Sequence, residues 1–184
     1  MEKLLAAASK LRMGYGLDEN MQLGALVSSK HRDNVLDFID KGVAEGAELL
    51  LDGRKKEPED CPNAAFVGPT VFDRVRPEMS IAQEEIFGPV ASVIRAADLD
   101  AALELIAANE FGHSAMIFTE SGRTAREFEY RATCGNIGIN IGVAATQAMA
   151  TLGSIKESFY GDLHGRSESI QFFTDRKIVI SRWS

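Results

Sequence analysis

The stretch from Val90 to Asn140 decides the fold class, and it reads VASVIRAADLDAALELIAANEFGHSAMIFTESGRTAREFEYRATCGNIGIN. Its apolar spacing predicts two helices, Asp98–Ala108 and Gly122–Ala132. Between and around the helices it predicts three strands, Val90–Ala96, Ser114–Phe118 and Asn136–Asn140. Strands that alternate with helices form a parallel sheet with right-handed crossovers. The sequence therefore predicts an α/β fold.

The regions on either side of this stretch contain further elements. Helices are expected over Glu2–Leu11 and Ser29–Glu45, and the second has Ser29 as its N-cap. Its apolar face is expected to comprise Val35, Phe38, Ile39 and Val43. We expect a strand over Glu48–Leu51, a disordered loop over Asp52–Asn63, a loop over Gly161–Glu168 and a separate β-branched segment over Lys177–Trp183.

The composition excludes several classes of protein. The chain has 184 residues, of which 45% are hydrophobic and 26% charged, as in a soluble globular domain. Its net charge of −7 argues against nucleic acid or an anionic membrane as a partner, because neither attracts an acidic surface. There is no apolar run long enough to span a bilayer. Two distant cysteines support no disulfide framework, so a reducing cytoplasmic location is expected.

The cysteines are interpreted as structural and the histidines as surface residues without a metal, so we predict no catalytic residue and no metal site. Cys61 follows several acidic residues, and Cys134 follows a predicted helix end; both surroundings disfavour a thiolate. The chain has three histidines, His31, His113 and His164. Their spacing is not that of metal ligands. We expect His31 to be solvated at a charged helix start, and His164 to lie on a surface loop.

A more specific signal is the segment Gln83–Val90, which reads QEEIFGPV. Two carboxylates precede an aromatic residue, a Gly-Pro turn and a strand. Taken alone, this pattern indicates an acidic loop that leads into a strand. The residues Glu84–Val90, however, resemble the EEIFGPV motif of aldehyde dehydrogenases.

Other segments extend that resemblance over essentially the whole chain. Phe66–Thr70 resembles the strand entry that lies upstream of the motif in the family, and Gly135–Asn140 resembles a late strand. Three further segments resemble the methylmalonate-semialdehyde dehydrogenase branch in particular; they are Lys156–Asp162, Phe172–Thr174 and Trp183.

The resemblance implies roles for two residues. Glu85 corresponds to the glutamate that binds the nicotinamide-side ribose of NAD, and Phe87 to the aromatic residue near the nicotinamide. A carboxylate can accept two hydroxyl hydrogen bonds, and a ring can support a flat heterocycle. The family's chemistry is thiolate attack on an aldehyde, hydride transfer to NAD and release of the acyl group. In this branch, release is to coenzyme A with loss of carbon dioxide.

The resemblance also implies an organisation. It predicts a partial, parallel-sheet catalytic domain over residues 1–174, and a C-terminal strand over residues 175–184 that pairs with a neighbouring subunit in a homo-oligomer. The family's nucleophilic cysteine and its NAD-binding domain lie upstream of the matching region, and Val143–Ser154 lacks the prolines and aromatics usual near the aldehyde pocket.

Two interpretations of these departures stay open. The chain is either a truncated semialdehyde dehydrogenase portion that is inactive alone, or a non-catalytic assembly partner or folded remnant. A third, less favoured interpretation is an unrelated small-ligand protein of α/β class.

Overall fold

The computed structural model describes residues 1–56, 58, 61, 64–144, 151–160 and 165–183. The chain divides into two compact units, Met1–Arg95 and Ala96–Ser184, each with its own elements. The expected division at residues 174 and 175 stays a prediction. Within the described residues, the helices are too short or too polar for any of them to cross a bilayer.

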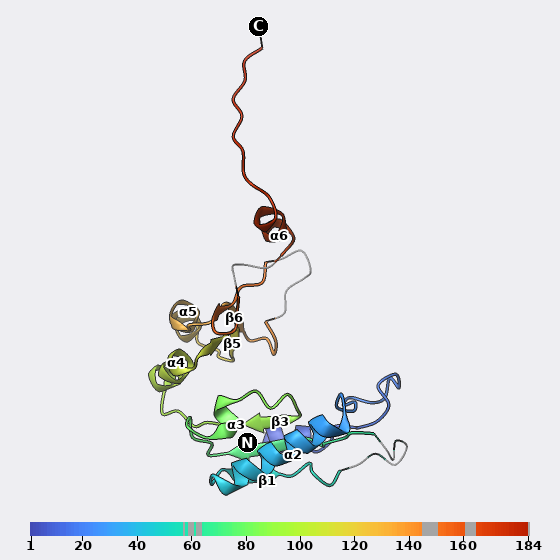
Figure 1. The fold of residues 1–184 in the computed structure, drawn as a ribbon. Coiled ribbons are helices and arrows are strands. Elements are labelled where there is room, and N and C mark those ends of the chain that lie inside the picture. Colours follow the sequence, from blue (N-terminus) through green and yellow to red (C-terminus); the bar gives the residue numbers. More distant parts are fainter. Residues whose placement is uncertain (57, 59–60, 62–63, 145–150, 161–164, 184) are drawn as a thin grey trace. The chain divides into compact units, whose positions relative to one another are not determined.

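Among its described residues, the first unit has three helices and a three-stranded sheet (Figure 1). The sheet has the order β1-β2-β3, in which β1 is antiparallel to β2 and β2 is parallel to β3. Thr70 lies opposite Val90, so the strand that precedes Arg74 is paired with the strand that follows the Gly-Pro turn. The elements are α1 (Glu2–Ala8), α2 (Ser29–Ala44), β1 (Glu48–Leu51), β2 (Thr70–Asp73), α3 (Ser80–Gln83) and β3 (Val90–Ser92).

The core of this unit lies between α2 and the sheet. Val35 and Ile39 of α2 and Phe72 of β2 are completely buried in one cluster with Met79 and Ile81. Burial of each such side chain contributes about 1.5–3 kcal/mol. Helix α2 therefore forms a fixed support for the segments that pack against it.

Helix α2 confirms the predicted element but corrects two of its details. The N-cap is Ser28 rather than Ser29, because the extended backbone of Ser28 lets its Oγ accept a hydrogen bond from the His31 N–H, at 3.1 Å. Val43 is 45% exposed, whereas Gly42 is buried. A Cβ at Gly42 would lie 2.9 Å from Ile81 Cδ1, so the missing side chain lets α3 approach α2 closely.

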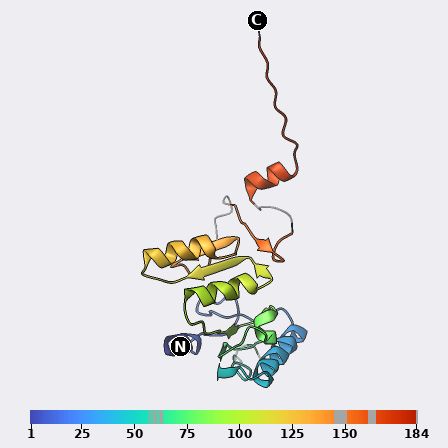
Figure 2. The ribbon, with the colours of Figure 1, turned by 90° about the vertical axis from the view of Figure 1, so that its left-hand side faces the viewer.

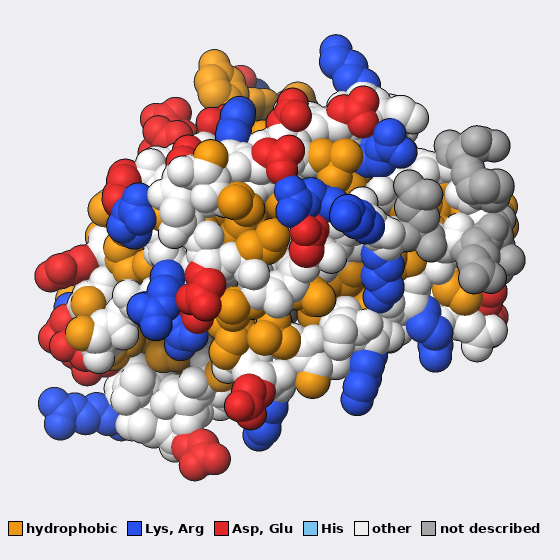
Figure 3. All heavy atoms as spheres, turned by 90° about the horizontal axis from the view of Figure 1, so that it is seen from below, with side chains coloured by type: hydrophobic (Ala, Val, Ile, Leu, Met, Phe, Trp, Pro, Cys, Tyr) orange, Lys and Arg blue, Asp and Glu red, His pale blue; other side chains and the backbone are white. Residues whose placement is uncertain are grey.

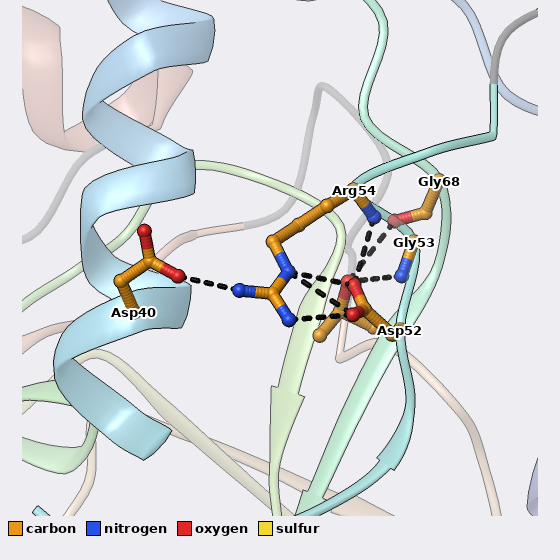
Figure 4. Close-up of polar contacts among 6 residues, drawn as sticks. Asp40, Asp52, Gly53, Arg54 and Gly68 are labelled. Atoms are coloured by element: carbon orange, nitrogen blue, oxygen red, sulfur yellow. Dashed lines mark hydrogen bonds and ion pairs between the residues drawn. The ribbon is translucent and has the colours of Figure 1, made fainter. Parts of the chain in front are cut away.

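The loop after β1 is held by ion pairs and by close backbone contact (Figure 4). The Arg54 guanidinium pairs with Asp52 at 2.6 Å and with Asp40 of α2 at 2.5 Å. The Gly53 N–H donates to Thr70 Oγ1 at 3.1 Å. The backbones at Gly53 and Gly68 are in direct contact, since the Gly68 N–H donates to the Gly53 carbonyl at 2.9 Å. Part of the predicted disordered loop, residues 57, 59–60 and 62–63, lies outside the described residues.

In the part of the second unit that the structure describes, there are two short strand pairs and three helices (Figure 2). Strands β5 and β6 are parallel and are joined through α5, while β4 and β7 are antiparallel. Helix α4 neighbours α5, and each buries one large side chain, Leu103 and Phe128. The elements are α4 (Leu99–Ala108), β4 (Phe111–Gly112), β5 (Ser114–Ile117), α5 (Gly122–Arg131), β6 (Asn136–Ile139), β7 (Ile155–Lys156) and α6 (Arg166–Phe172).

Side-chain caps begin both of the predicted central helices. Asp98 Oδ1 accepts a hydrogen bond from the Ala101 N–H at 2.9 Å, and Ser121 Oγ accepts one from the Thr124 N–H at 3.2 Å. The strand, helix and strand limits from Ser114 to Ile139 agree with the prediction to within one residue. The α/β class with parallel strand pairs is confirmed.

Other predictions need correction. The three strands expected in one sheet are divided, because β3 pairs with β2 whereas β5 pairs with β6. Helix α6 occupies Arg166–Phe172, part of which was expected to be a loop, and α1 ends at Ala8 rather than Leu11. Residues 177–183 are exposed and pair with no strand among the described residues of this chain, so the expected pairing of the C-terminal segment with a neighbouring subunit stays a prediction. A strand needs a hydrogen-bonding partner, which these residues do not have within this chain as described.

Candidate functional site

The two predicted cofactor residues lie on one cavity in the first unit. The segment between α3 and β3 places Glu84, Glu85 and Phe87 at the surface and buries Ile86. The cavity has a volume of about 290 Å³ and is open to solvent. It is lined by Ile81, Glu84, Glu85, Ile86, Phe87, Gly88, Val90 and Ser92. The structure therefore brings together the carboxylate and the ring that the sequence singled out.

The ends of this segment are anchored to the sheet and to the helices. The Thr70 N–H donates to the Pro89 carbonyl at 2.9 Å, which ties the Gly-Pro turn to β2. Ser92 Oγ donates to the Ile81 carbonyl at 3.0 Å, which joins β3 to α3. Glu45, the residue at the end of α2, accepts a hydrogen bond from the Ser80 N–H at 2.8 Å. The cavity wall is thus built from contacts that are remote in sequence.

Phe87 has an unusual backbone conformation. Its φ is +59°, a region that L-residues other than glycine, asparagine and aspartate rarely adopt. Phe87 is 73% exposed, so its ring is free to support a ligand. Its carbonyl oxygen accepts a hydrogen bond from His31 Nε2 at 2.8 Å, and the two rings meet edge to face at 6.4 Å and 72°.

The position of His31 corrects the expectation that it is solvated. The side chain is half-buried and contacts Phe87, which lies 56 residues further along the chain. Its charged neighbours in sequence suggested a surface position, but helical periodicity places it one turn before the buried Val35. That spacing was the available signal for a contact with the core side of the helix.

Glu85 has an exposed carboxylate that makes no hydrogen bond or ion pair with the rest of the chain as described. Two oxygens with free lone pairs can accept hydrogen bonds from a vicinal diol. Beside them, the exposed Phe87 ring offers an apolar face. The residues present therefore fit the ribose and the flat heterocycle of a nicotinamide nucleotide.

The other sequence candidates lie elsewhere. Burial raises the pKa of the Cys134 thiol, and the positive charge of Lys156 acts in the opposite direction. The expectation of a poor nucleophile agrees with this direction, but the main cause is burial rather than the end of a helix. Cys61 is a free, half-buried thiol, and His113 Nδ1 lies 3.3 Å from Ser154 Oγ. His164 lies outside the described residues.

The described residues form no metal centre. Among the described residues, no group of three or more histidine, cysteine or acidic side chains is arranged to hold a metal ion. Acidic and basic side chains are interspersed on the face drawn in Figure 3, with hydrophobic side chains between them.

Comparison with known proteins identifies the family. The sequence model of the aldehyde dehydrogenase family matches residues 1–179 of this chain. Malonate-semialdehyde dehydrogenase 1 of Geobacillus kaustophilus is 44% identical over 184 residues, which is 100% of this chain and 38% of that protein. The chain thus spans about two fifths of the length of the curated relatives that it matches.

Solved structures agree with this assignment. The methylmalonate-semialdehyde dehydrogenase of Oceanimonas doudoroffii superposes with a TM-score of 0.92 at 36% identity, covering 100% of this chain and 38% of that one. Betaine aldehyde dehydrogenase of Staphylococcus aureus in complex with NAD+ has a TM-score of 0.83 at 27% identity, covering 90% of this chain and 33% of that one. The chain therefore belongs to the aldehyde dehydrogenase family.

Proposed function

We propose that this chain is the nicotinamide-side part of an NAD-dependent, coenzyme A-acylating dehydrogenase subunit that acts on malonate or methylmalonate semialdehyde. The observation that carries the proposal is the shared cavity of Glu85 and Phe87, which is formed by the family's EEIFGPV motif. The names of the relatives support the substrate class.

In this proposal, Glu85 accepts hydrogen bonds from the two hydroxyls of the nicotinamide-side ribose. The Phe87 ring lies against the nicotinamide and limits its rotation. Bound NAD supplies the hydride acceptor. A ring and a carboxylate held by an anchored segment reduce the freedom of the reacting heterocycle, which favours transfer in one geometry.

We further propose that the chain is inactive alone. The half-buried thiol of Cys134 is poorly suited to thiolate attack, since its partial burial raises its pKa. The nucleophile and the remaining NAD contacts are then supplied by the segment that precedes the matching region in the relatives. Coenzyme A is the acyl acceptor in this scheme.

Assembly is proposed to use the C-terminal segment in a cytoplasmic homo-oligomer. Ile178, Val179 and Ile180 are 83%, 74% and 94% exposed, and Trp183 is 91% exposed. An extended β-branched segment of this kind pairs readily with the edge of another sheet. We propose that its partner is a neighbouring subunit.

The alternative is a non-catalytic assembly partner or folded remnant. It is favoured by Val143–Ser154, which contains no proline and no aromatic residue, whereas the branch that the chain resembles usually has both there. Residues 145–150 of this segment lie outside the described residues. The alternative keeps the C-terminal assembly role and abandons the chemistry.

A chimaera separates the two functions. In the Geobacillus kaustophilus relative, the matching 184 residues would be replaced by this chain, and NADH formation would be followed with malonate or methylmalonate semialdehyde and coenzyme A. The chain alone is expected to be silent and the chimaera active. Glu85→Gln is expected to raise the KM for NAD about 10- to 100-fold, as expected when hydrogen bonds to a charge are lost.

The controls define what each outcome means. Asp37→Ala removes an exposed carboxylate from α2 and should leave the KM unchanged. An assembled chimaera without NADH formation would favour the non-catalytic alternative. Thiol-dependent NADH formation by this chain alone would contradict the proposal that it is inactive by itself.

A further inference from the structure

We infer that His31 is a positioning residue: its Nε2–H holds the Phe87 carbonyl, and thereby the left-handed backbone that presents the Phe87 ring to the cavity. The importance of this ring for cofactor binding rests on the proposed function. The hold on the backbone does not, and it can be tested without any cofactor.

The backbone that carries the His31 side chain is held in place on both sides. Ser28 Oγ accepts a hydrogen bond from the His31 N–H at 3.1 Å and so caps the first turn of α2. The Leu26 N–H donates to the Ala65 carbonyl at 2.7 Å, which holds the chain just before this cap. His31 therefore projects from a backbone that is constrained on both sides.

His31 donates a hydrogen bond to the Phe87 carbonyl oxygen. A carbonyl oxygen can only accept, so Nε2 must carry the hydrogen in the 2.8 Å contact with Phe87. Within the described residues, no other group donates a hydrogen bond to this oxygen. Both the neutral Nε2–H tautomer and the imidazolium can make the bond.

One turn further along the same helix, Val35 makes a second contact, with Gly88. Val35 follows His31 by four residues, so both side chains are on one face of α2. A Cβ at Gly88 would lie 2.8 Å from Val35 Cγ2, which shows how closely the backbone approaches the helix. His31 and Val35 thus hold the consecutive residues Phe87 and Gly88.

The contact has a clear structural task. A phenylalanine with φ of +59° is strained, and such conformations persist only where the surroundings enforce them. Rotation of the Phe87 backbone to negative φ would turn its carbonyl away from His31 and redirect the ring. The donor on His31 opposes that rotation, while Phe87 remains 73% exposed toward ligands.

Three substitutions in the full chain test the inference by NMR. Positive φ brings the Phe87 amide hydrogen close to its Hα, so a strong intraresidue cross-peak reports the conformation. His31→Ala is expected to lose the cross-peak and to shift the Glu85–Gly88 resonances. His31→Gln, which keeps a side-chain N–H donor, is expected to retain both. His31→Phe keeps a ring without a donor and is expected to behave like alanine.

Each outcome supports or contradicts the role of the His31 donor in holding the Phe87 backbone. Lys30→Ala, an exposed neighbour on α2, is the matched control and should leave the Phe87 signal unchanged. Unchanged Phe87 signals in His31→Ala would overturn the inference. Retention in His31→Phe would overturn it as well, because the ring contact would then suffice. Loss in His31→Gln with a folded α2 would show that a donor does not restore the conformation, which also counts against it.

The same variants in the chimaera distinguish this inference from the proposed function. We expect His31→Ala to raise the KM for NAD severalfold and His31→Gln to restore it. If the Phe87 cross-peak responds as expected but the chimaera with the original residues does not use NAD, the proposed function fails and the role of His31 in holding Phe87 stands.

Discussion

Arg95 and Asp73 form a two-point ion pair at the end of β2. Arg95 Nε lies 2.8 Å from Oδ1 of Asp73, and one terminal nitrogen of Arg95 lies 2.6 Å from Oδ2. The backbone N–H of Arg74 donates to the same Oδ1 at 2.8 Å. These hydrogen bonds, with that from Arg95 foremost, lower the pKa of Asp73 from 3.8 to about 2.

This ion pair predicts how stability depends on pH. Because the pKa is lower in the folded chain, Asp73 contributes stability that is present above about pH 4 and is lost as the pH falls toward about 2. We expect Asp73→Asn to be less stable than the original chain at pH 7. Urea unfolding between pH 5 and pH 2.5 should show the difference shrinking as the pH falls. A difference that stays constant over this range would contradict the role of the Asp73 charge.

The contact between Gly53 and Gly68 predicts a large effect of a single methyl group. A Cβ at Gly53 would lie 2.0 Å from the Gly68 carbonyl oxygen, and backbone cannot yield as a side chain can. Gly53→Ala should reduce the free energy of unfolding by at least about 2 kcal/mol. Gly16→Ala is the matched control, because a Cβ there meets nothing within 4 Å. It should be neutral or stabilise by up to about 1 kcal/mol, and equal effects of the two changes would refute the clash.

The hydrogen bonds of Lys156 are expected to stabilise the end of α4. Its Nζ donates to the carbonyls of Ile106, Ala107 and Asn109 at 2.8, 3.1 and 2.8 Å, where the helix has no further backbone donors. Lys156→Met should cost about 2 kcal/mol, since three hydrogen bonds to a charge are removed. Hydrogen exchange should accelerate at the amides of the last turn of α4. Lys177→Met, at an exposed position, provides the comparison, and the two variants should differ clearly.

Cys134 predicts a slow alkylation. Burial raises the pKa of its thiol, so the thiolate fraction at pH 7 is smaller than that of an ordinary cysteine. With Cys61→Ser in place, the iodoacetamide reaction of the remaining thiol should be slower than that of glutathione. Unfolding in urea should remove the difference. A folded-state rate equal to or above that of glutathione would reopen Cys134 as a nucleophile.

Local sequence patterns account for much of the fold. The helices α2, α4 and α5 follow from apolar spacing together with Ser and Asp caps, and β5 and β6 from short apolar runs around α5. These features act within about one turn of helix or one strand, so neighbouring residues are sufficient to predict them. The division of strands between sheets required partners such as β2, which the patterns did not reveal.

The candidate site was predicted in part. Glu85 and Phe87 were found through the motif around them, and both line the cavity. His31 was misplaced because its neighbours in sequence are charged, whereas its contact with Phe87 spans 56 residues. Similarly, the burial of Gly42 in place of Val43 depends on how close α3 comes to α2.

By itself, the sequence determined the α/β class, the main helices and the carboxylate and ring of the EEIFGPV segment, because each depends on residues that are close along the chain. Only the tertiary structure decided that His31 donates to the Phe87 carbonyl, that Val35 lies against Gly88 and that β3 pairs with β2. The physical reason is that a φ of +59° at Phe87 is unfavourable locally and is stabilised only by a helix that is brought there by the packing of the core.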